Sequence, residues 1–135
     1  MPQLTVFSSA GDGRISSGWD SWANCRTGSG LAVDYTSVTV RLEISTGYAG
    51  ATNRHLSRLP FAFDTSSIPD DATIDSAILS VYCTGVANGG VTPAPSVVMV
   101  ATSQTSTTSL ANADWTAVTF TQISTSTIAI GSLVT

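Results

Sequence analysis

The sequence contains no lysine and a single glutamate, Glu43, and only 10% of its 135 residues are charged. A typical soluble domain has about 25% charged residues. Helices draw mainly on lysine, glutamate and alanine for their exposed faces, so this shortage argues against a helical protein. Serine and threonine take the place of the missing charges, with 20 residues each, and threonine favours strands because its branched Cβ packs well on a pleated surface. The composition predicts an all-β domain.

Clustered basic residues and long apolar runs are also missing. The five basic residues are arginines scattered from Arg14 to Arg58, and the net charge is −4. Binding to phosphate backbones needs a basic stripe, so we expect no nucleic-acid partner. No apolar run approaches the ~20 residues that cross a bilayer, so we expect no membrane insertion. Met1–Ala10 lacks the features of a secretory signal, which predicts a mature fragment with an added methionine or a protein released without a signal, as virion components are.

Few residues are suited to catalysis or metal binding. His55 is the only histidine, and no nucleophile-elbow motif accompanies it, whereas a catalytic triad needs a nucleophile, a base and a carboxylate. One histidine and two distant cysteines do not match a zinc site, and the acids are mostly turn aspartates rather than the facing pair of a glycosidase. We therefore predict no enzyme activity, no metal and no cofactor. Calcium at Asp12 and Asp20, with glycine-turn carbonyls as further ligands, is the alternative.

Cys25 and Cys83 leave two interpretations open. They can form one disulfide, or each can pack as a small hydrophobe, since cysteine is among the most buried residue types. The sequence does not place their Cα atoms within bridging distance.

Period-two alternation of apolar and polar residues recurs along the chain, while the helical period of 3.6 does not. A half-buried strand is predicted over 38–44, a central strand over 77–83, and a face shared by Leu59, Phe61 and Phe63, with Pro60 marking an edge or bulge. Shorter strands are predicted over 98–102, 118–122 and 128–130, and one helical turn over 109–115. Turn signals separate these segments. Many short strands with such spacing predict an antiparallel β-sandwich of jelly-roll type, formed by 1–135 as a single domain.

The middle of the chain also carries a specific pattern. Arg58–Pro69 (RLPFAFDTSSIP), Ala72–Ile74 and Ser76–Tyr82 (SAILSVY) resemble the signature of the DNRLRE-type domain family, and Phe7–Gly13 resembles its first strand and turn. Ala113-Asp114-Trp115 and Ile128–Ile130 are similar to later parts of the pattern. The resemblance implies a jelly-roll module of the kind found in bacterial surface proteins, polysaccharide-active proteins and phage structural proteins.

The chain departs from this family in two places. Arg54–Leu59 is more polar than the family's approach to the Phe-Asp turn, and the family pattern continues with further strands beyond the point where this sequence ends at Thr135. A jelly roll without its last strands exposes apolar surface and unpaired backbone. We therefore expect a truncated chain, or strands supplied by another subunit or by a complementing segment.

Arg58 and Asp64 are assigned a structural role in the turn of this signature. They lie six residues apart, so the arginine is expected to pair with Asp64 or to tie the backbone of the turn. Asp64 precedes Thr65, Ser66 and Ser67, which suits an Asx or Ser/Thr turn that satisfies loose amides.

A ligand site is predicted around Trp19, Asp20 and Trp22, with Tyr48 as a further loop aromatic. Sugars present flat apolar faces and many hydroxyls, so their sites combine an exposed aromatic ring with short polar side chains. Gly18–Asn24 is read as a loop that offers both. The alternative is that one or both tryptophans cap the end of the core, where Trp115 is also expected.

Two functions follow. The first is a non-catalytic module of a virion or of an extracellular or cell surface, which binds glycans or another host-surface ligand. The second is a purely structural role, as a virion decoration or fibre protein that acts through contacts with other subunits. The missing signal and missing strands favour the structural role, whereas the Trp19–Trp22 segment and the family resemblance favour glycan binding.

Overall fold

The computed structural model describes residues 4–37, 39–46, 54–87, 96–104, 106–125 and 128–129. Its elements follow the order β1 (Arg14–Trp19), α1 (Trp22–Thr27), β2 (Ala32–Asp34), β3 (Ile44–Thr46), β4 (Arg54–Arg58), β5 (Ser96–Val97), β6 (Val100–Thr102), η1 (Asn112–Thr116), β7 (Val118–Gln122) and β8 (Ile128–Ala129). Here η1 is a 3₁₀ helix. The prediction of an all-β protein is confirmed, since strands predominate over two short helical pieces.

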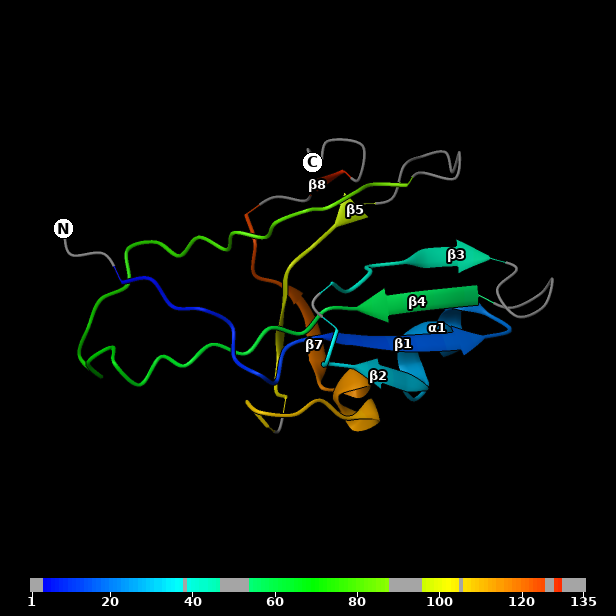
Figure 1. Ribbon diagram of the computed structural model, residues 1–135, viewed down its shortest axis with the longest axis horizontal. Coiled ribbons are helices and arrows are strands. Elements are labelled where there is room, and N and C mark those ends of the chain that lie inside the picture. Colours follow the sequence, from blue (N-terminus) through cyan, green and yellow to red (C-terminus); the bar gives the residue numbers. More distant parts are fainter. Residues whose placement is uncertain are drawn as a thin grey trace. The chain divides into compact units, whose positions relative to one another are not determined.

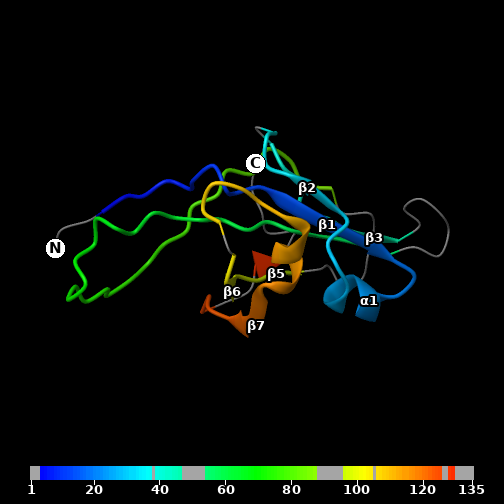
Figure 2. The ribbon, with the colours of Figure 1, turned by 90° about the horizontal axis from the view of Figure 1, so that it is seen from below.

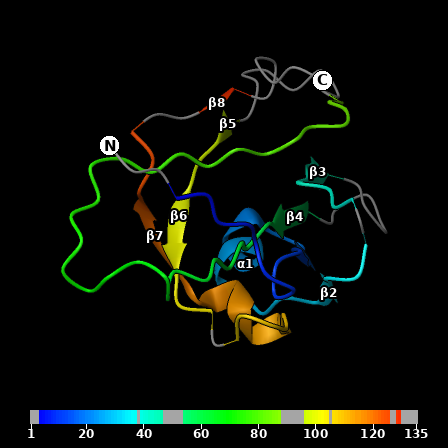
Figure 3. The ribbon, with the colours of Figure 1, turned by 60° about the vertical axis from the view of Figure 1, so that its left-hand side comes forward.

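The chain divides into two compact units. The first contains residues 1–68 and 102–119, and the second contains residues 69–101 and 120–135. The chain passes between the units after Ile68, within β6 and within β7. β6 and β7 pair with each other (Figure 3). In the second unit, β5 and β8 pair antiparallel.

The first unit is built on a four-stranded antiparallel sheet of order β2-β1-β4-β3 (Figure 1). The register between β1 and β4 places Ile15 opposite Arg58 and Ser17 opposite Leu56. Side chains alternate between the faces of a sheet, so these four residues share one face. Among the described strands, β2 and β3 each pair on one side only, and the sheet is open.

The small apolar core lies on this face. Ile15, Leu110 and Trp115 form its buried cluster, with Val33 and Leu56 packed against it. α1 and η1 lie on the same side of the sheet, as the view turned by 90° shows (Figure 2). The predicted core position of Trp115 is confirmed, because its side chain is 0% exposed. The helical turn predicted over 109–115 is also confirmed, as η1.

Two local interactions determine where β1 begins and where α1 lies. Gly13 has φ +156°, and a Cβ there would lie 2.4 Å from the Asp34 carbonyl oxygen, so only glycine permits β2 to approach the start of β1. Ser21 caps α1, because its hydroxyl accepts a hydrogen bond from the Asn24 amide at 3.2 Å. The helix ends at Gly28, whose amide donates to the Asn24 carbonyl at 2.8 Å.

The predicted strand over 38–44 is wrong for most of its length. Residues 39–43 are irregular, and β3 begins only at Ile44, while Val38 lies outside the described residues. The Ser57 hydroxyl donates to the Arg41 carbonyl at 3.0 Å and also bonds the Glu43 amide. This side chain satisfies backbone groups that a regular ladder would otherwise pair.

The predicted central strand over 77–83 is wrong within the described chain. Residues 72–87 form no helix and no strand, although the apolar alternation is present. A strand needs a neighbour for its backbone groups, and none of the described segments pairs with this one. The shared face of Leu59, Phe61 and Phe63 is reduced to an isolated bridge between Phe63 and Ser8.

Three later strands agree with the sequence patterns. β6 coincides with the end of the predicted 98–102 strand, and β7 covers all of 118–122. β8 covers Ile128–Ala129, while Ile130 lies outside the described residues.

Candidate functional site

The predicted Trp19–Trp22 loop is instead a strand-to-helix turn. Trp19 is the last residue of β1 and Trp22 is the first residue of α1. Both side chains are half-buried. A Cβ on Gly28 would lie 3.0 Å from Nε1 of Trp19, so the indole packs against the end of α1. Its Nε1 is buried without a hydrogen-bond partner in the described structure. The Nε1 edge of Trp19 therefore packs against the protein and is closed to a ligand.

Asp20 and Trp22 lie together at the start of α1. Asp20 is exposed, and its Oδ1 accepts a hydrogen bond from Nδ2 of Asn24 at 2.9 Å. The exposed polar pair therefore lies within one helical turn of a half-buried tryptophan. Tyr48, the fourth residue of the predicted site, lies outside the described residues.

Arg58 is held by the core, on the face of the sheet that carries Ile15. Its guanidinium lies 3.9 Å from the centre of the Trp115 ring, donates to the Trp115 carbonyl, and donates to the Arg26 carbonyl at 3.0 Å. Burial lowers the pKa of Arg58 to about 10, because a charged group loses solvation there. Arg58 is thus tied to η1 and to α1.

Asp64 forms the predicted Asx turn. Its Oδ1 accepts a hydrogen bond from the Ser66 amide at 2.9 Å, and the Ile68 amide closes the turn on the Thr65 carbonyl at 2.9 Å. The Ser66 hydroxyl and then the Ser66 amide lower the pKa of Asp64, although the carboxylate is fully exposed. The turn therefore presents a carboxylate that stays ionised in mildly acidic solution.

An open pocket of about 610 Å³ lies beside this turn, in the first unit. We call it the Phe63 pocket; it is lined by Ser9, residues 63–66, Thr107 and Thr108. One aromatic ring, one carboxylate and several hydroxyls thus meet in one depression. The sequence signal that could have found it is the FDTSS run together with the TSTTS run at 105–109, but nothing in the sequence shows that the two runs are adjacent.

The second unit carries an exposed apolar segment, residues 73–87, which we call the 73–87 segment. Its largest exposed side chains are Ile78 at 88%, Tyr82 at 87%, Val81 at 61% and Ile74 at 59%. Most apolar residues of this size are buried in soluble domains. Ile74, Ile78 and Tyr82 are four residues apart, so they share one face of an extended segment.

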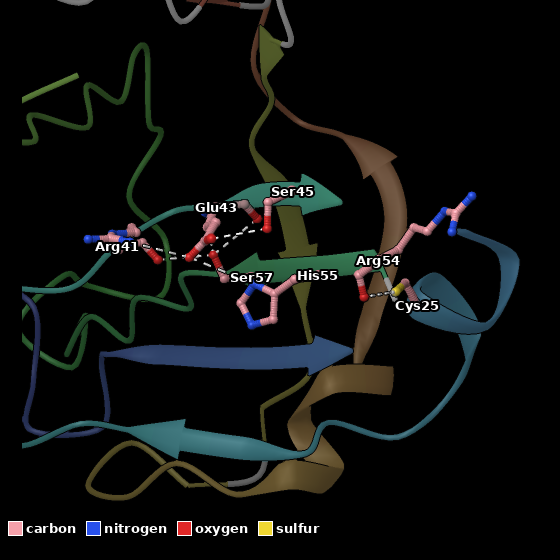
Figure 4. Close-up of polar contacts among 7 residues, drawn as sticks. All are labelled: Cys25, Arg41, Glu43, Ser45, Arg54, His55 and Ser57. Atoms are coloured by element: carbon pink, nitrogen blue, oxygen red, sulfur yellow. Dashed lines mark hydrogen bonds and ion pairs between the residues drawn. The ribbon is translucent and has the colours of Figure 1, made fainter. Parts of the chain in front are cut away.

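Glu43, the only glutamate, gathers a polar cluster beside β4 (Figure 4). Its Oε2 lies 3.7 Å from Nη1 of Arg41 and 3.8 Å from Nδ1 of His55, and its Oε1 accepts from the Ser45 hydroxyl at 3.1 Å. Ser57, on the same face of β4 as His55, has its hydroxyl on the backbone of residues 41–43. The cluster fastens this segment to β4, and the sequence analysis did not identify Glu43 or Ser57 as members of any cluster.

Both cysteines are free thiols, which supports the interpretation without a disulfide. Cys25 is buried in α1, and its Sγ donates to the Arg54 carbonyl at 3.1 Å (Figure 4). Cys83 is half-buried and lies 3.4 Å from the Gly85 carbonyl oxygen.

The two aspartates considered for calcium lie at opposite ends of β1. A six-residue strand spans about 17 Å, so Asp12 and Asp20 cannot bind the same ion. Asp12 accepts from the Ser8 hydroxyl at 2.6 Å, and Asp20 accepts from Asn24. No group of three or more His, Cys, Asp or Glu side chains suited to a metal occurs among the described residues.

The fold and these surfaces define an antiparallel, all-β module. Comparison with known proteins adds no relative: no family model matches the chain, and no curated protein or solved structure is detectably similar to it. In the part of the chain that the structure describes, no helix has the length and apolar character needed to cross a bilayer.

Proposed function

We propose that this protein is a non-catalytic structural module of a virion or of an extracellular surface, which acts through contacts with other copies of itself. In this proposal a jelly-roll-type sandwich is completed between subunits. The observation that carries it is the 73–87 segment, whose sequence has the alternation of a strand although the segment has no strand partner in the described chain. An extended segment that has no strand partner among the described residues and that exposes apolar side chains is suited to pairing with a neighbour.

The partner that we propose is the same segment, or a sheet edge, of a second copy. Most soluble oligomers are closed assemblies of identical subunits. Such pairing would bury Ile78 and Tyr82, which are 88% and 87% exposed in the single chain. These two residues lie four apart on one face of an extended segment.

Light scattering after gel filtration tests this proposal. We expect the chain to form a defined oligomer at micromolar concentration and Ile78→Asp to shift it towards the monomer. Ser29→Asp is the matched control, because it adds the same charge at an exposed polar position outside the 73–87 segment. A wild-type chain that stays monomeric up to about 1 mM, or an equal effect of the two variants, would contradict the proposal.

A second function, binding of a glycan or another host-surface ligand, is favoured by the Phe63 pocket. Its aromatic ring and hydroxyls are the groups that sugar sites use. Asp20 and Trp22 form a weaker candidate for the same role, since Trp19 packs against α1. The two functions are compatible, because an assembled surface protein can carry ligand sites on each subunit. A glycan-array screen of the purified chain tests binding directly, and the absence of any specific signal would remove this second function.

A further inference from the structure

The Phe63 pocket combines an aromatic ring, a carboxylate and several hydroxyl-bearing residues. Phe63 is 36% exposed, so its ring is accessible to a ligand. Asp64 supplies an exposed carboxylate whose Oδ1 already accepts from the Ser66 amide. Thr65 and Thr107 line the pocket, and both are exposed.

The wall that carries Thr107 and Thr108 is fixed by hydrogen bonds before any ligand arrives. The Gly11 amide donates to the Thr107 carbonyl at 3.0 Å, and a Cβ on Gly11 would lie 2.5 Å from that carbonyl carbon. The Ser106 hydroxyl accepts from the amides of Thr108 and Ser109, each at 3.2 Å. Because this wall is already ordered, binding a ligand costs less conformational entropy.

The side chain of Gln104 also stabilises the wall that carries Thr107 and Thr108. Its Nε2 donates to the carbonyls of Gly11 at 2.8 Å and Ser106 at 2.7 Å. The opposite wall is the Asx turn of Asp64, which is joined to the N-terminal segment because the Ser9 amide donates to the Ala62 carbonyl at 2.8 Å. Both walls of the pocket are therefore preformed, as is usual for small-ligand sites.

The charge of the pocket restricts its ligand. Its lining contains one carboxylate and no basic residue, and the chain has a net charge of −4. An anionic ligand such as a phosphate or a sialic acid would be repelled without a compensating cation. A neutral ligand with many hydroxyls can instead donate to the carboxylate, which strengthens the hydrogen bond.

We propose that the Phe63 pocket binds one neutral hexose ring of a glycan. The apolar C–H face of the ring stacks on Phe63, because these hydrogens carry partial positive charge and the aromatic face is negative. Neighbouring sugar hydroxyls donate to Asp64 and exchange hydrogen bonds with Thr65 and Thr107. The volume of about 610 Å³ lies within the ~300–1,000 Å³ range of ligand sites. This inference rests on the second function proposed above and names its site and ligand class.

The test uses the full chain labelled with ¹⁵N and a panel of neutral oligosaccharides: maltohexaose, cellohexaose, chitohexaose and galactotetraose. Sialyllactose is the anionic comparison. We expect at least one neutral sugar to shift the amide signals of Ser66, Thr107 and Thr108, and sialyllactose to bind at least tenfold more weakly. Phe63→Ala should weaken binding at least tenfold, and Asp64→Asn several-fold, while Trp22→Ala should leave it unchanged.

Asp64→Asn separates a loss of the carboxylate charge from a loss of the folded turn. The asparagine oxygen can still accept from the Ser66 amide, so the turn keeps its shape while the charge is lost. Binding that shifts Asp20–Asn24 instead, and that Trp22→Ala abolishes, would overturn the pocket and leave glycan binding standing. Failure of every sugar in the panel to shift the pocket amides would overturn the inference, and light scattering of the same samples would still test assembly independently.

Discussion

The Arg58 guanidinium connects the buried Trp115 ring to two backbone carbonyls, one in η1 and one in α1. Hydrogen bonds from a charged group contribute about 1.5–3 kcal/mol each, and the contact with the ring adds about 0.5–1 kcal/mol. We therefore expect Arg58→Lys to lower the free energy of unfolding by about 2 kcal/mol in urea titrations followed by tryptophan fluorescence. Lysine keeps the charge but lacks the planar fork that reaches both carbonyls.

Arg14→Lys is the matched control for this prediction. Arg14 lies opposite Asp34 in the β1–β2 register. It precedes Ile15 in β1, so its side chain lies on the face of the sheet opposite the core cluster, and its replacement should change stability by less than about 0.5 kcal/mol. Equal losses for the two variants would mean that Arg58 acts only as a surface charge.

Asp64 gives a prediction of pH dependence at the scale of one residue. The hydroxyl and amide of Ser66 hold the pKa of Asp64 below its ordinary value of 3.8. A carboxyl whose pKa is lowered by folding stabilises the protein above the unfolded value, and this contribution is lost as the pH falls through the folded value. The affected window therefore lies below about pH 4, and the turn should be intact at neutral pH.

NMR titration of the Asp64 carboxyl carbon measures this effect. Ser66→Ala should raise the pKa of Asp64 part of the way towards 3.8, because the amide hydrogen bond remains after the hydroxyl is removed. Ser67→Ala, at the next exposed position, should leave the titration as in the wild type. Identical curves for Ser66→Ala and Ser67→Ala would contradict the assignment.

At the scale of elements, period-two alternation identified β6, β7 and part of β8, because each of these strands pairs within the chain. The same signal predicted strands over 38–44 and 77–83, of which 39–43 and 77–83 are irregular. Alternation records only which side chains can share a face, whereas a strand also needs a partner for its backbone. At residues 41–43 the Ser57 hydroxyl bonds the backbone in place of a partner strand. The segment 77–83 has no partner strand among the described residues.

The central strand β1 escaped prediction for the opposite reason. Its sequence, RISSGW, places serines where the pattern requires apolar residues, although Ser16 and Ser17 are buried. The stretch around His55, between two arginines, is strand-like in sequence and forms β4. Turn chemistry was easier to predict, since the Asx turn at Asp64 depends on residues within two positions of one another. The Phe63 pocket could not be predicted, because its two walls are about 40 residues apart in sequence.

The junction between β1 and η1 supplies a prediction about packing of elements. A Cβ on Gly30 would lie 2.7 Å from Cγ2 of Ile15 and 2.9 Å from the Asn112 carbonyl oxygen. Gly30→Ala should therefore destabilise the first unit by about 1–3 kcal/mol, since overpacking forces backbone shifts. The measurement is urea unfolding followed by tryptophan fluorescence, which reports on Trp115 beside the junction.

Gly18→Ala is the control within β1. Its nearest neighbours would be the Arg54 carbonyl oxygen at 3.7 Å and Cδ2 of His55 at 3.9 Å, which are ordinary contacts. Alanine also costs less conformational entropy than glycine in a strand, so stability should be unchanged or slightly raised. A larger loss at Gly18 than at Gly30 would show that η1 does not pack against β1 in this way.

For the whole molecule, the two units differ in how their strands find partners. The first unit contains a paired four-stranded sheet with its own core, whereas the second contains the exposed 73–87 segment and the short β5–β8 pair. Amides open to solvent exchange with a free energy that reflects local pairing. Exchange in β1 and β4 should therefore be slow at every protein concentration, and exchange in the 73–87 segment should be fast in the single chain.

If subunits assemble through the 73–87 segment, its amide exchange rate depends on protein concentration. Hydrogen–deuterium exchange at about 1 μM and about 500 μM should show the 73–87 segment becoming protected as subunits associate, because binding adds stability in proportion to the logarithm of partner concentration. Ile78→Asp should keep the segment unprotected at both concentrations, while Ser29→Asp should behave as the wild type. Protection already present at the lower concentration in a chain shown to be monomeric would mean that the partner strand lies within the same molecule, and the sandwich would then be complete without a second copy.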